Sequence, residues 1–99
     1  MPDFNNDIRL AVNTGEVGIG HRDVIRSISA SKAQAVVVAA KARKELINDI
    51  YHMVSIANVK LIKFNGNSLD LGTLCGKPYP VSSIAIISPG NSGILNEEY

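Results

Sequence analysis

Cys75 is the only cysteine of this 99-residue chain, and its thiol is the first candidate for nucleophilic chemistry. A cysteine nucleophile needs a base, usually histidine, within hydrogen-bond reach and a third group that orients this base. The two histidines are His21 and His52, and no spacing couples either of them to Cys75. We therefore expect Cys75 to be a small core residue of a short helix. The chain is not expected to be an enzyme or to hold a metal or another cofactor, because metal-ligand spacing is also absent.

The stretch "TGEVGIGHRD" offers a different chemistry, the binding of phosphate. It fails the dinucleotide fingerprint, because Asp23 stands where the third glycine belongs, and no Lys-Ser or Lys-Thr pair follows Gly20. Gly20 before a helix start nevertheless leaves backbone N–H groups free for phosphate oxygens, and Arg22 lies beside them. The alternative is a tight turn in which Asp23 matches the helix charge. The residues leave both readings open.

The stretch "KPYPV" places a cation and an aromatic ring in a stiff segment. Pro78 and Pro80 fix their own φ angles and restrict the residues before them, Lys77 and Tyr79, to extended backbone. A rigid, exposed Tyr79 could stack on an unpaired nucleic-acid base. The alternative is a tyrosine that folds back over the core.

Composition sets limits on these possibilities. Ninety-nine residues with 45% hydrophobic and 19% charged side chains predict one domain, residues 1–99, of an ordinary globular protein. The longest apolar run, residues 35–40, is too short to cross a bilayer, so no membrane is expected. One cysteine cannot form an internal disulfide, which favours a reducing compartment. Residues 22–44 hold six basic residues against one acidic residue, a net charge of +5. This indicates either a face that binds a polyanion or a solvated helix surface.

Hydrophobic periodicity predicts alternating helices and strands. Apolar residues recur at helical spacing in residues 4–12, and Asp3 could cap this helix while Gly15 could end it in a left-handed turn. The run "AQAVVVAA" predicts a central strand that is buried on both faces. For the helix in "NSLDLGTLC", we expect Asn67 or Ser68 as the cap and Gly76 as the end. The whole order, α-β-α-β-α-β-α-β, predicts a three-layer α/β/α sandwich with a mostly parallel sheet.

With these segments in view, the chain resembles the L-thirty-e family of large-subunit ribosomal proteins, within the kink-turn-binding superfamily. The resemblance covers roughly residues 4–95 and lies in "TGEVGIGHRDVIRSI", "AVVVAAKARKELINDI" and "NSLDLGTLCGKPYPVSSIAII". Its most specific part is "LGTLCGKPYPV", and the compact length looks archaeal-like. It implies the same sandwich with a four-stranded mixed sheet. It also implies binding to a kinked RNA, in which an internal loop stacks tandem G·A pairs and splays out bases.

The resemblance further implies that three loops form the RNA contact. The residues that match are Gly20, His21, Arg22 and Arg26 in the first; Lys41, Ala42 and Arg43 in the second; and Leu74, Gly76, Lys77, Tyr79 and Val81 in the third. At position 41 many relatives carry asparagine, which can both donate and accept. Lys41 can only donate, so its contact could be a guanine edge or a phosphate.

The expected function is therefore a structural RNA-binding protein that stabilises a kink-turn of ribosomal RNA in the large subunit. Expected partners are that RNA and neighbouring ribosomal proteins, for a cytoplasmic, ribosome-associated chain that is a monomer when free. Three alternatives remain. One is a kink-turn binder of an RNA-modification particle or of messenger regulation. Another is a small-molecule enzyme that uses Cys75, and the last is a protein-interaction module that pairs through the strand in "SSIAII".

Overall fold

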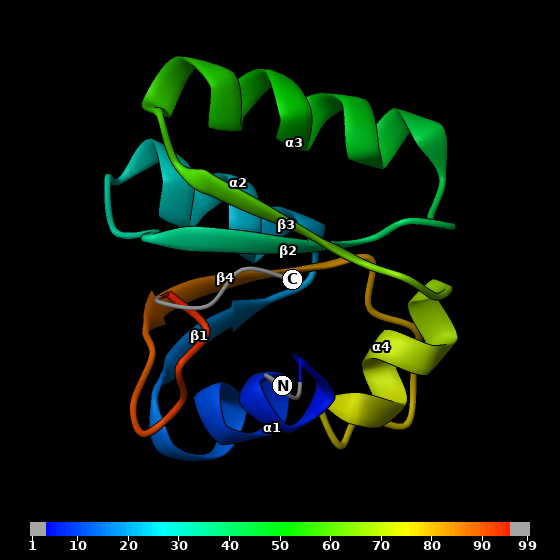
Figure 1. Cartoon of the computed structure of the whole chain (residues 1–99). Helices are drawn as coiled ribbons and strands as arrows, with labels where there is room; N and C mark the ends of the chain where they lie inside the picture. Colours follow the sequence, from blue (N-terminus) through cyan, green and yellow to red (C-terminus); the bar gives the residue numbers. More distant parts are fainter. Residues whose placement is uncertain (1–3, 96–99) are drawn as a thin grey trace.

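The computed structural model describes residues 4–95, so the predicted cap Asp3 lies outside the described residues. Four helices and four strands alternate along the chain (Figure 1). In order, the elements are α1 (Phe4–Thr14), β1 (Glu16–Ile19), α2 (His21–Ser29), β2 (Ala35–Ala39), α3 (Lys44–Ala57), β3 (Lys60–Phe64), α4 (Ser68–Leu74) and β4 (Ser83–Ser88). The order expected from periodicity is confirmed. In residues 4–95, no helix has both the length and the apolar composition of a membrane-spanning segment.

The strands form one mixed sheet in the order β1-β4-β2-β3. β2 pairs with β3 in parallel, whereas β4 runs antiparallel to both of its neighbours, β1 and β2. The sandwich and the mixed sheet are as expected. The sheet is not mostly parallel, however, because only one of its three strand pairings is parallel. β1, β2 and β3 do share one direction. The insertion of β4 between β1 and β2 makes two of the three pairings antiparallel.

β4 runs the other way because the chain after β3 does not return across the sheet. The segment that follows α4 folds back onto this helix, where the Lys77 N–H donates to the Gly72 carbonyl at 2.9 Å and the Val81 N–H donates to the Ser68 carbonyl at 2.8 Å. The chain therefore stays at the edge where β3 ended, and β4 has to start from there.

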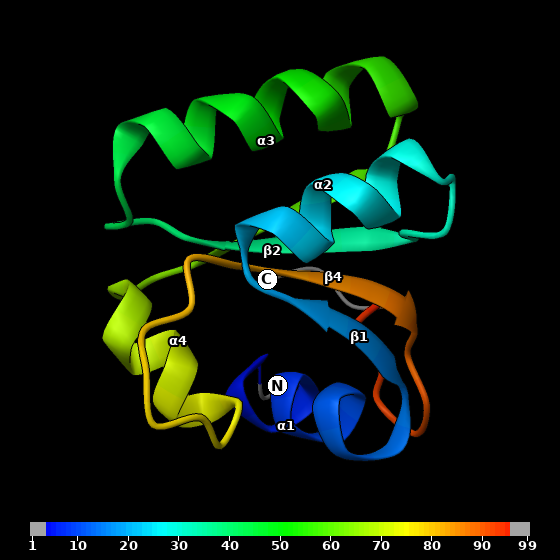
Figure 2. The ribbon, with the colours of Figure 1, turned by 180° about the vertical axis from the view of Figure 1, so that it is seen from behind.

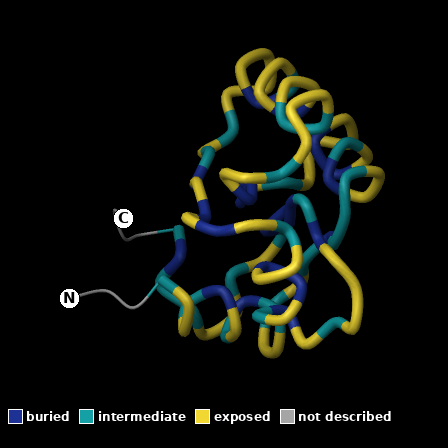
Figure 3. The backbone as a smooth tube through the Cα atoms, turned by 90° about the vertical axis from the view of Figure 1, so that its right-hand side faces the viewer, coloured by how far each residue is buried: buried dark blue, intermediate teal, exposed yellow. Residues whose placement is uncertain are grey.

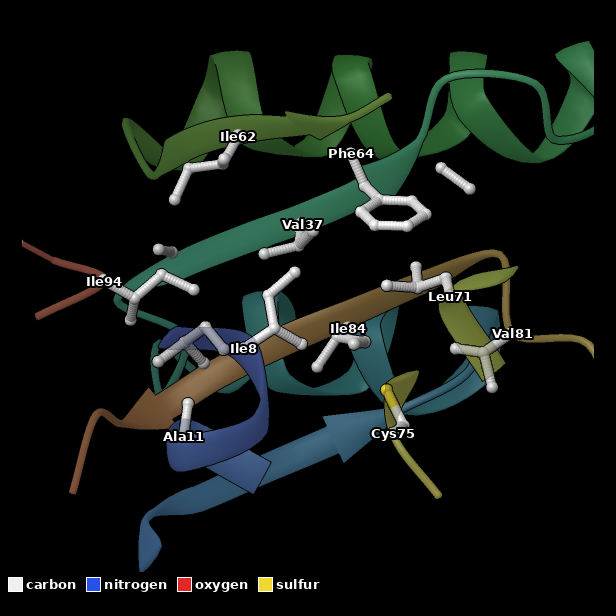
Figure 4. Packing of buried hydrophobic residues seen from close by; sticks show 13 residues of the cluster. Ile8, Ala11, Val37, Ile62, Phe64, Leu71, Cys75, Val81, Ile84 and Ile94 are labelled. Carbon is white, nitrogen blue, oxygen red and sulfur yellow. The ribbon is translucent and has the colours of Figure 1, made fainter. Parts of the chain in front are cut away.

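Two hydrophobic clusters fill the space between the layers. α2 and α3 cover one face of the sheet, and α1 and α4 cover the other, as the views from the two sides show (Figures 1 and 2). β2 supplies both clusters, because Val36 and Val38 face α2 and α3, whereas Val37 faces α1 and α4. All five residues of β2 are buried, which confirms the expected central strand. Figure 4 shows the cluster on the α1 and α4 side.

Gly15 ends α1 for a reason that differs from the expectation. Its φ angle is not among the positive values, which occur at Gly20, Gly76 and Gly90 among the described glycines. A Cβ atom on Gly15 would instead meet the Ser88 carbonyl oxygen at 2.1 Å. Close approach of the chain end of β4, and not a left-handed turn, therefore requires glycine here.

Candidate nucleic-acid interface

Three connecting segments meet at one edge of the sheet, where β1 and β2 end and β4 begins. We call residues 20–22, 40–43 and 74–82 together the loop edge. Backbone hydrogen bonds join the segments: the Gly20 N–H donates to the Ser83 carbonyl at 3.0 Å, and the Ala39 N–H donates to the Ser82 carbonyl at 2.9 Å. Figure 3 faces this edge, and the exposed connections lie there around the buried strands. The mixed sheet thus brings the three predicted loops together.

The first segment ends in the N-terminus of α2. Gly20 precedes the helix with φ of 98° and has open space around its Cα, so its backbone conformation and not crowding favours glycine. No side chain caps this helix. The first backbone N–H groups of α2 therefore remain free of intrahelical partners, and they carry the positive end of the helix dipole. Arg22 is exposed beside them, which suits the phosphate reading of this turn.

The second segment leads into α3. The site predicted from the sequence did not include the N-terminus of this helix. α3 also begins at the loop edge without a side-chain cap, after Arg43. Lys41, Arg43 and the unpredicted Lys44 are all exposed here. A helix that follows a strand starts at the carboxyl end of that strand, so the strand-helix order held the signal for this second helix N-terminus. Two helix N-termini thus lie at this edge, together with four exposed cations at or next to it: Arg22, Lys41, Arg43 and Lys44.

A fourth segment, the turn after β3, was also missed. The Gly66 carbonyl accepts a hydrogen bond from the Lys41 N–H at 3.1 Å, and the Phe64 carbonyl accepts one from the Ala40 N–H at 2.9 Å. These bonds fix the backbone of the second loop against the end of β3. The exposed Lys41 side chain therefore projects from a backbone that these hydrogen bonds fix in place.

The third segment is built on α4. Asn67 caps this helix, because its Oδ1 accepts the Asp70 N–H at 2.8 Å while the Asp70 carboxylate receives the Asn67 N–H at 3.5 Å. This reciprocal pair is a capping box. Gly76 follows the helix with φ of 77°, a left-handed conformation that favours glycine. The expected cap and end of α4 are both confirmed.

Beyond Gly76, the chain presents Tyr79 outward. Tyr79 is 50% exposed, which favours a ring that faces solvent over one that folds back over the core. The Tyr79 backbone packs closely against α4, because a Cβ atom added to Gly72 would lie only 2.1 Å from the Tyr79 carbonyl oxygen. Lys77 is half-buried and its N–H is held by the Gly72 carbonyl. The segment thus holds an exposed ring on a fixed backbone.

Not all of the residues carried over from the resemblance offer their side chains to solvent. Val81 is 1% exposed and belongs to the core beside Leu71 (Figure 4). Ala42 and Leu74 are half-buried and pack against the same cluster. These three side chains hold the loops from inside. Any contact that Val81 makes with a ligand has to come from its main chain.

Acidic side chains reduce the positive charge of the interface at three places. Arg26 lies one helical turn from Arg22 and is 3.9 Å from the Asp23 carboxylate. Another 3.9 Å contact joins Arg43 to Glu45. His21 Nε2 is 3.5 Å from the Asp49 carboxylate of α3. Since all of these acids are exposed, such pairs stabilise the fold little, and a polyanion could compete for the arginines.

Two buried polar atoms near the loop edge have no hydrogen-bond partner among the described residues, namely His21 Nδ1 and Ser83 Oγ. Ser83 is fully buried, and its carbonyl holds the Gly20 N–H next to His21.

Cys75 is part of the core, as expected. It is 7% exposed and packs in the cluster on the α4 side (Figure 4). Burial raises the pKa of its thiol from an ordinary 9.0 to about 11, and the charge of Lys77 offsets only part of this rise. The thiol therefore stays protonated at neutral pH, which removes the nucleophile that the enzyme alternative requires.

Alkylation with iodoacetamide at pH 8 tests this assignment. The unfolded chain loses the thiol proton near pH 9 and the folded chain near pH 11. The folded state thus keeps a proton that the unfolded state loses, and its stability falls as the pH rises through this interval. We expect the native chain to react at least about 10-fold more slowly than the same chain in urea. Equal rates would contradict a buried, protonated thiol.

Comparisons with known proteins agree with this architecture. A sequence model described as "Ribosomal protein L7Ae/L30e/S12e/Gadd45 family" matches residues 3–96. The chain belongs to this family. It is 38% identical over 94 residues to the large ribosomal subunit protein eL30 of Methanococcus maripaludis, which covers 95% of this chain and 94% of that protein. It is 39% identical over 93 residues to eL30 of Saccharolobus solfataricus, with coverages of 94% and 86%.

For this member of the L7Ae/L30e family, the sheet order contradicts the alternative of a protein-interaction module that pairs through the strand in "SSIAII". The "SSIAII" strand, β4, was expected to offer a pairing edge. β4 instead lies inside the sheet and pairs on both sides, with β1 and β2. Its backbone groups are therefore already occupied.

Proposed function

We propose that the chain is a structural RNA-binding protein of the large ribosomal subunit that holds a kink-turn of ribosomal RNA at its loop edge. The observation that carries this proposal is the meeting of three loops and two uncapped helix N-termini at one edge of the sheet. Family membership and the names of its archaeal relatives support the ribosomal setting. On the same grounds we infer ribosomal RNA and neighbouring ribosomal proteins as partners on the ribosome.

Phosphates are received by the positive part of this edge. Free N–H groups at the starts of α2 and α3 suit phosphate oxygens. Guanidinium and ammonium groups add charge close to these N–H groups, and all of them are exposed except the half-buried Lys77. The side chains concerned are Arg22, Arg26, Lys41, Arg43 and Lys77.

Unpaired bases are received by the third segment. Tyr79 offers an exposed ring for stacking. The turn around Gly76 offers backbone that a base can approach closely, because no side chain covers it. Since the turn is held to α4 by hydrogen bonds, these contacts are preformed and little ordering is needed on binding.

Binding of this kind stabilises the kink by selecting it. A free kinked RNA is unfavourable because its phosphates crowd together. A protein that contacts the kinked form alone shifts the RNA toward it by the difference in its affinity for the two forms. Messenger regulation or an RNA-modification particle would use the same interface, whereas the relatives' names favour the ribosome.

We infer that the free chain is a monomer. Among residues 4–95, the exposed large hydrophobic residues lie on three separate segments: Tyr51 and Ile56 on α3, Leu69 on α4, and Tyr79 on the loop edge. Scattered exposed residues of this kind are normal for a monomer.

The decisive experiment titrates a labelled kink-turn RNA and a matched straight duplex, in which Watson–Crick pairs replace the G·A pairs. End labels on the RNA report its bend. We expect the protein to bend the kink-turn RNA and to bind it at least about 10-fold more tightly than the duplex, since contacts to the kinked form alone drive the shift. Equal affinity for the two RNAs would overturn the kink-turn proposal and leave only general RNA binding.

Arg22→Ala tests the assignment of phosphate contacts. If Arg22 neutralises one phosphate, its loss weakens binding and lowers the slope of log K against log salt by about one unit. Titrations at three or more salt concentrations measure this slope. Lys32→Ala is the matched control, because Lys32 is an exposed cation between α2 and β2, at the opposite edge of the sheet. An equal change of slope for both variants would mean that binding follows net charge and not this site.

A further inference from the structure

A pocket of about 320 Å³ lies between α1 and α4, next to the loop edge, with which it shares Leu74. The two helices lie side by side under the sheet (Figure 1). Six residues line the pocket: Asn5 and Arg9 from α1, Phe64 from β3, and Asp70, Thr73 and Leu74 from α4. Phe64 is 8% exposed and Leu74 is half-buried, whereas the four polar residues are exposed. Apolar side chains thus form the bottom of the pocket and hydrogen-bonding groups its mouth.

Opposite charges face this pocket without pairing. No ion pair joins Arg9 to Asp70 in the described part of the chain, and within that part the side chains of Asn5 and Arg9 form no hydrogen bond or ion pair. Asp70 caps α4 through one carboxylate oxygen, and a carboxylate has about four acceptor positions. The pocket therefore offers hydrogen-bond donors at Arg9, acceptors at Asp70 and the side-chain amide of Asn5. The Thr73 hydroxyl already donates to the Leu69 carbonyl at 3.0 Å, so it can serve a ligand as an acceptor.

We propose that this pocket binds the guanine base of an unpaired nucleotide. A guanidinium group matches the O6 and N7 acceptors of guanine, and a carboxylate accepts from its N1–H and N2–H donors. Adenine presents no such pair of adjacent donors, and the pyrimidines present one donor group each. A pocket of this volume holds one base against the Phe64 and Leu74 side chains.

The surroundings favour a base that belongs to an RNA over a free nucleotide. Among residues 4–95, Arg9 is the only cation that lines the pocket. Once Arg9 contacts the base, these residues leave no positive group for a chain of phosphates. The pocket also adjoins the loop edge. Gly66 lies against Phe64 and Asp70, and its carbonyl holds the Lys41 N–H. This source of the base rests on the proposed function, and it extends the RNA contact to the far side of α4.

Nucleotide titrations followed by amide NMR test the pocket without any kink-turn. GMP and AMP carry the same phosphate, so a difference between them reports the base. We expect GMP to shift the amides of Asn5, Arg9 and Thr73 and to bind at least about 5-fold more tightly than AMP. Arg9→Gln should weaken GMP binding about 10-fold or more, whereas Lys32→Gln should leave it unchanged. Equal shifts from GMP and AMP, or no shifts at these residues, would overturn the proposal.

A second arm identifies the source of the base. A kink-turn RNA is extended by a single-stranded tail that carries one guanine, or adenine in the matched control. We expect the guanine tail to tighten binding about 5-fold for the native chain and to have no effect for Arg9→Gln. If GMP binds but the tail has no effect, the RNA source is wrong and a free nucleotide is the ligand. If GMP does not bind while the kink-turn RNA without a tail still binds, the guanine pocket is wrong and the proposed function stands. If the native chain does not bind the kink-turn RNA, the proposed function is overturned instead.

Discussion

Tyr79→Ala is expected to weaken binding of a kink-turn RNA by about 1–3 kcal/mol, the range found when one aromatic stacking partner of a base is removed. Half of the residue is exposed, so the substitution removes little of the core and the fold should keep its stability. The substitution removes no cationic side chain. The salt dependence of binding should therefore be that of the native chain, which separates a lost base contact from a lost phosphate contact.

Two further variants make this result specific. Tyr79→Phe keeps the ring and removes the hydroxyl, so it should retain most of the affinity. Tyr51→Ala removes another partly exposed tyrosine, which lies on α3 with Lys63 Nζ 5.8 Å from its ring centre. Its affinity for the RNA should not change. Calorimetry measures all three, and native affinity in Tyr79→Ala would mean that the base contacts lie elsewhere.

The sequence predicted those features that local rules determine. Asn67 or Ser68 was expected to cap the short helix α4, and Asn67 is the cap, with Asp70 completing a capping box. The run in β2 is continuous and β-branched, and the strand is buried on both faces. Gly76 was expected to end α4, and it follows this helix with a positive φ angle. In each case the residues that act on one another are close in sequence.

The sequence did not predict features that depend on contacts between distant segments. The position of β4 depends on the way residues 75–82 fold back onto α4, which periodicity does not record. The inward side chain of Val81 follows from the same folding. Gly15 looked like a left-handed helix end, but it is required by Ser88, which is 73 positions away. The pocket between α1 and α4 likewise exists only when residues from α1, β3 and α4 meet.

Gly72→Ala is expected to destabilise the protein, although it replaces a glycine inside a helix. Such a change ordinarily stabilises by about 0.5–1 kcal/mol, because alanine loses less backbone entropy on folding. Here the added Cβ atom would lie 2.1 Å from the Tyr79 carbonyl oxygen and 3.3 Å from the Val81 nitrogen. Since both neighbours are backbone atoms, the whole segment has to move. We expect a loss of about 1–3 kcal/mol in the free energy of unfolding, as for other overpacked positions.

Denaturant unfolding measures this loss, and Thr73→Ala is its control. Thr73 is the next residue of α4 and is exposed, so its substitution should change stability by about 0.5 kcal/mol or less. RNA binding by Gly72→Ala is measured at a temperature where the variant is fully folded. Because the displaced segment carries Tyr79 and the turn at Gly76 together, we expect its affinity to fall at least as far as that of Tyr79→Ala. A Gly72→Ala protein that is more stable than the native chain and binds RNA equally well would mean that this segment does not lie against α4, and the preformed base contacts would have no basis.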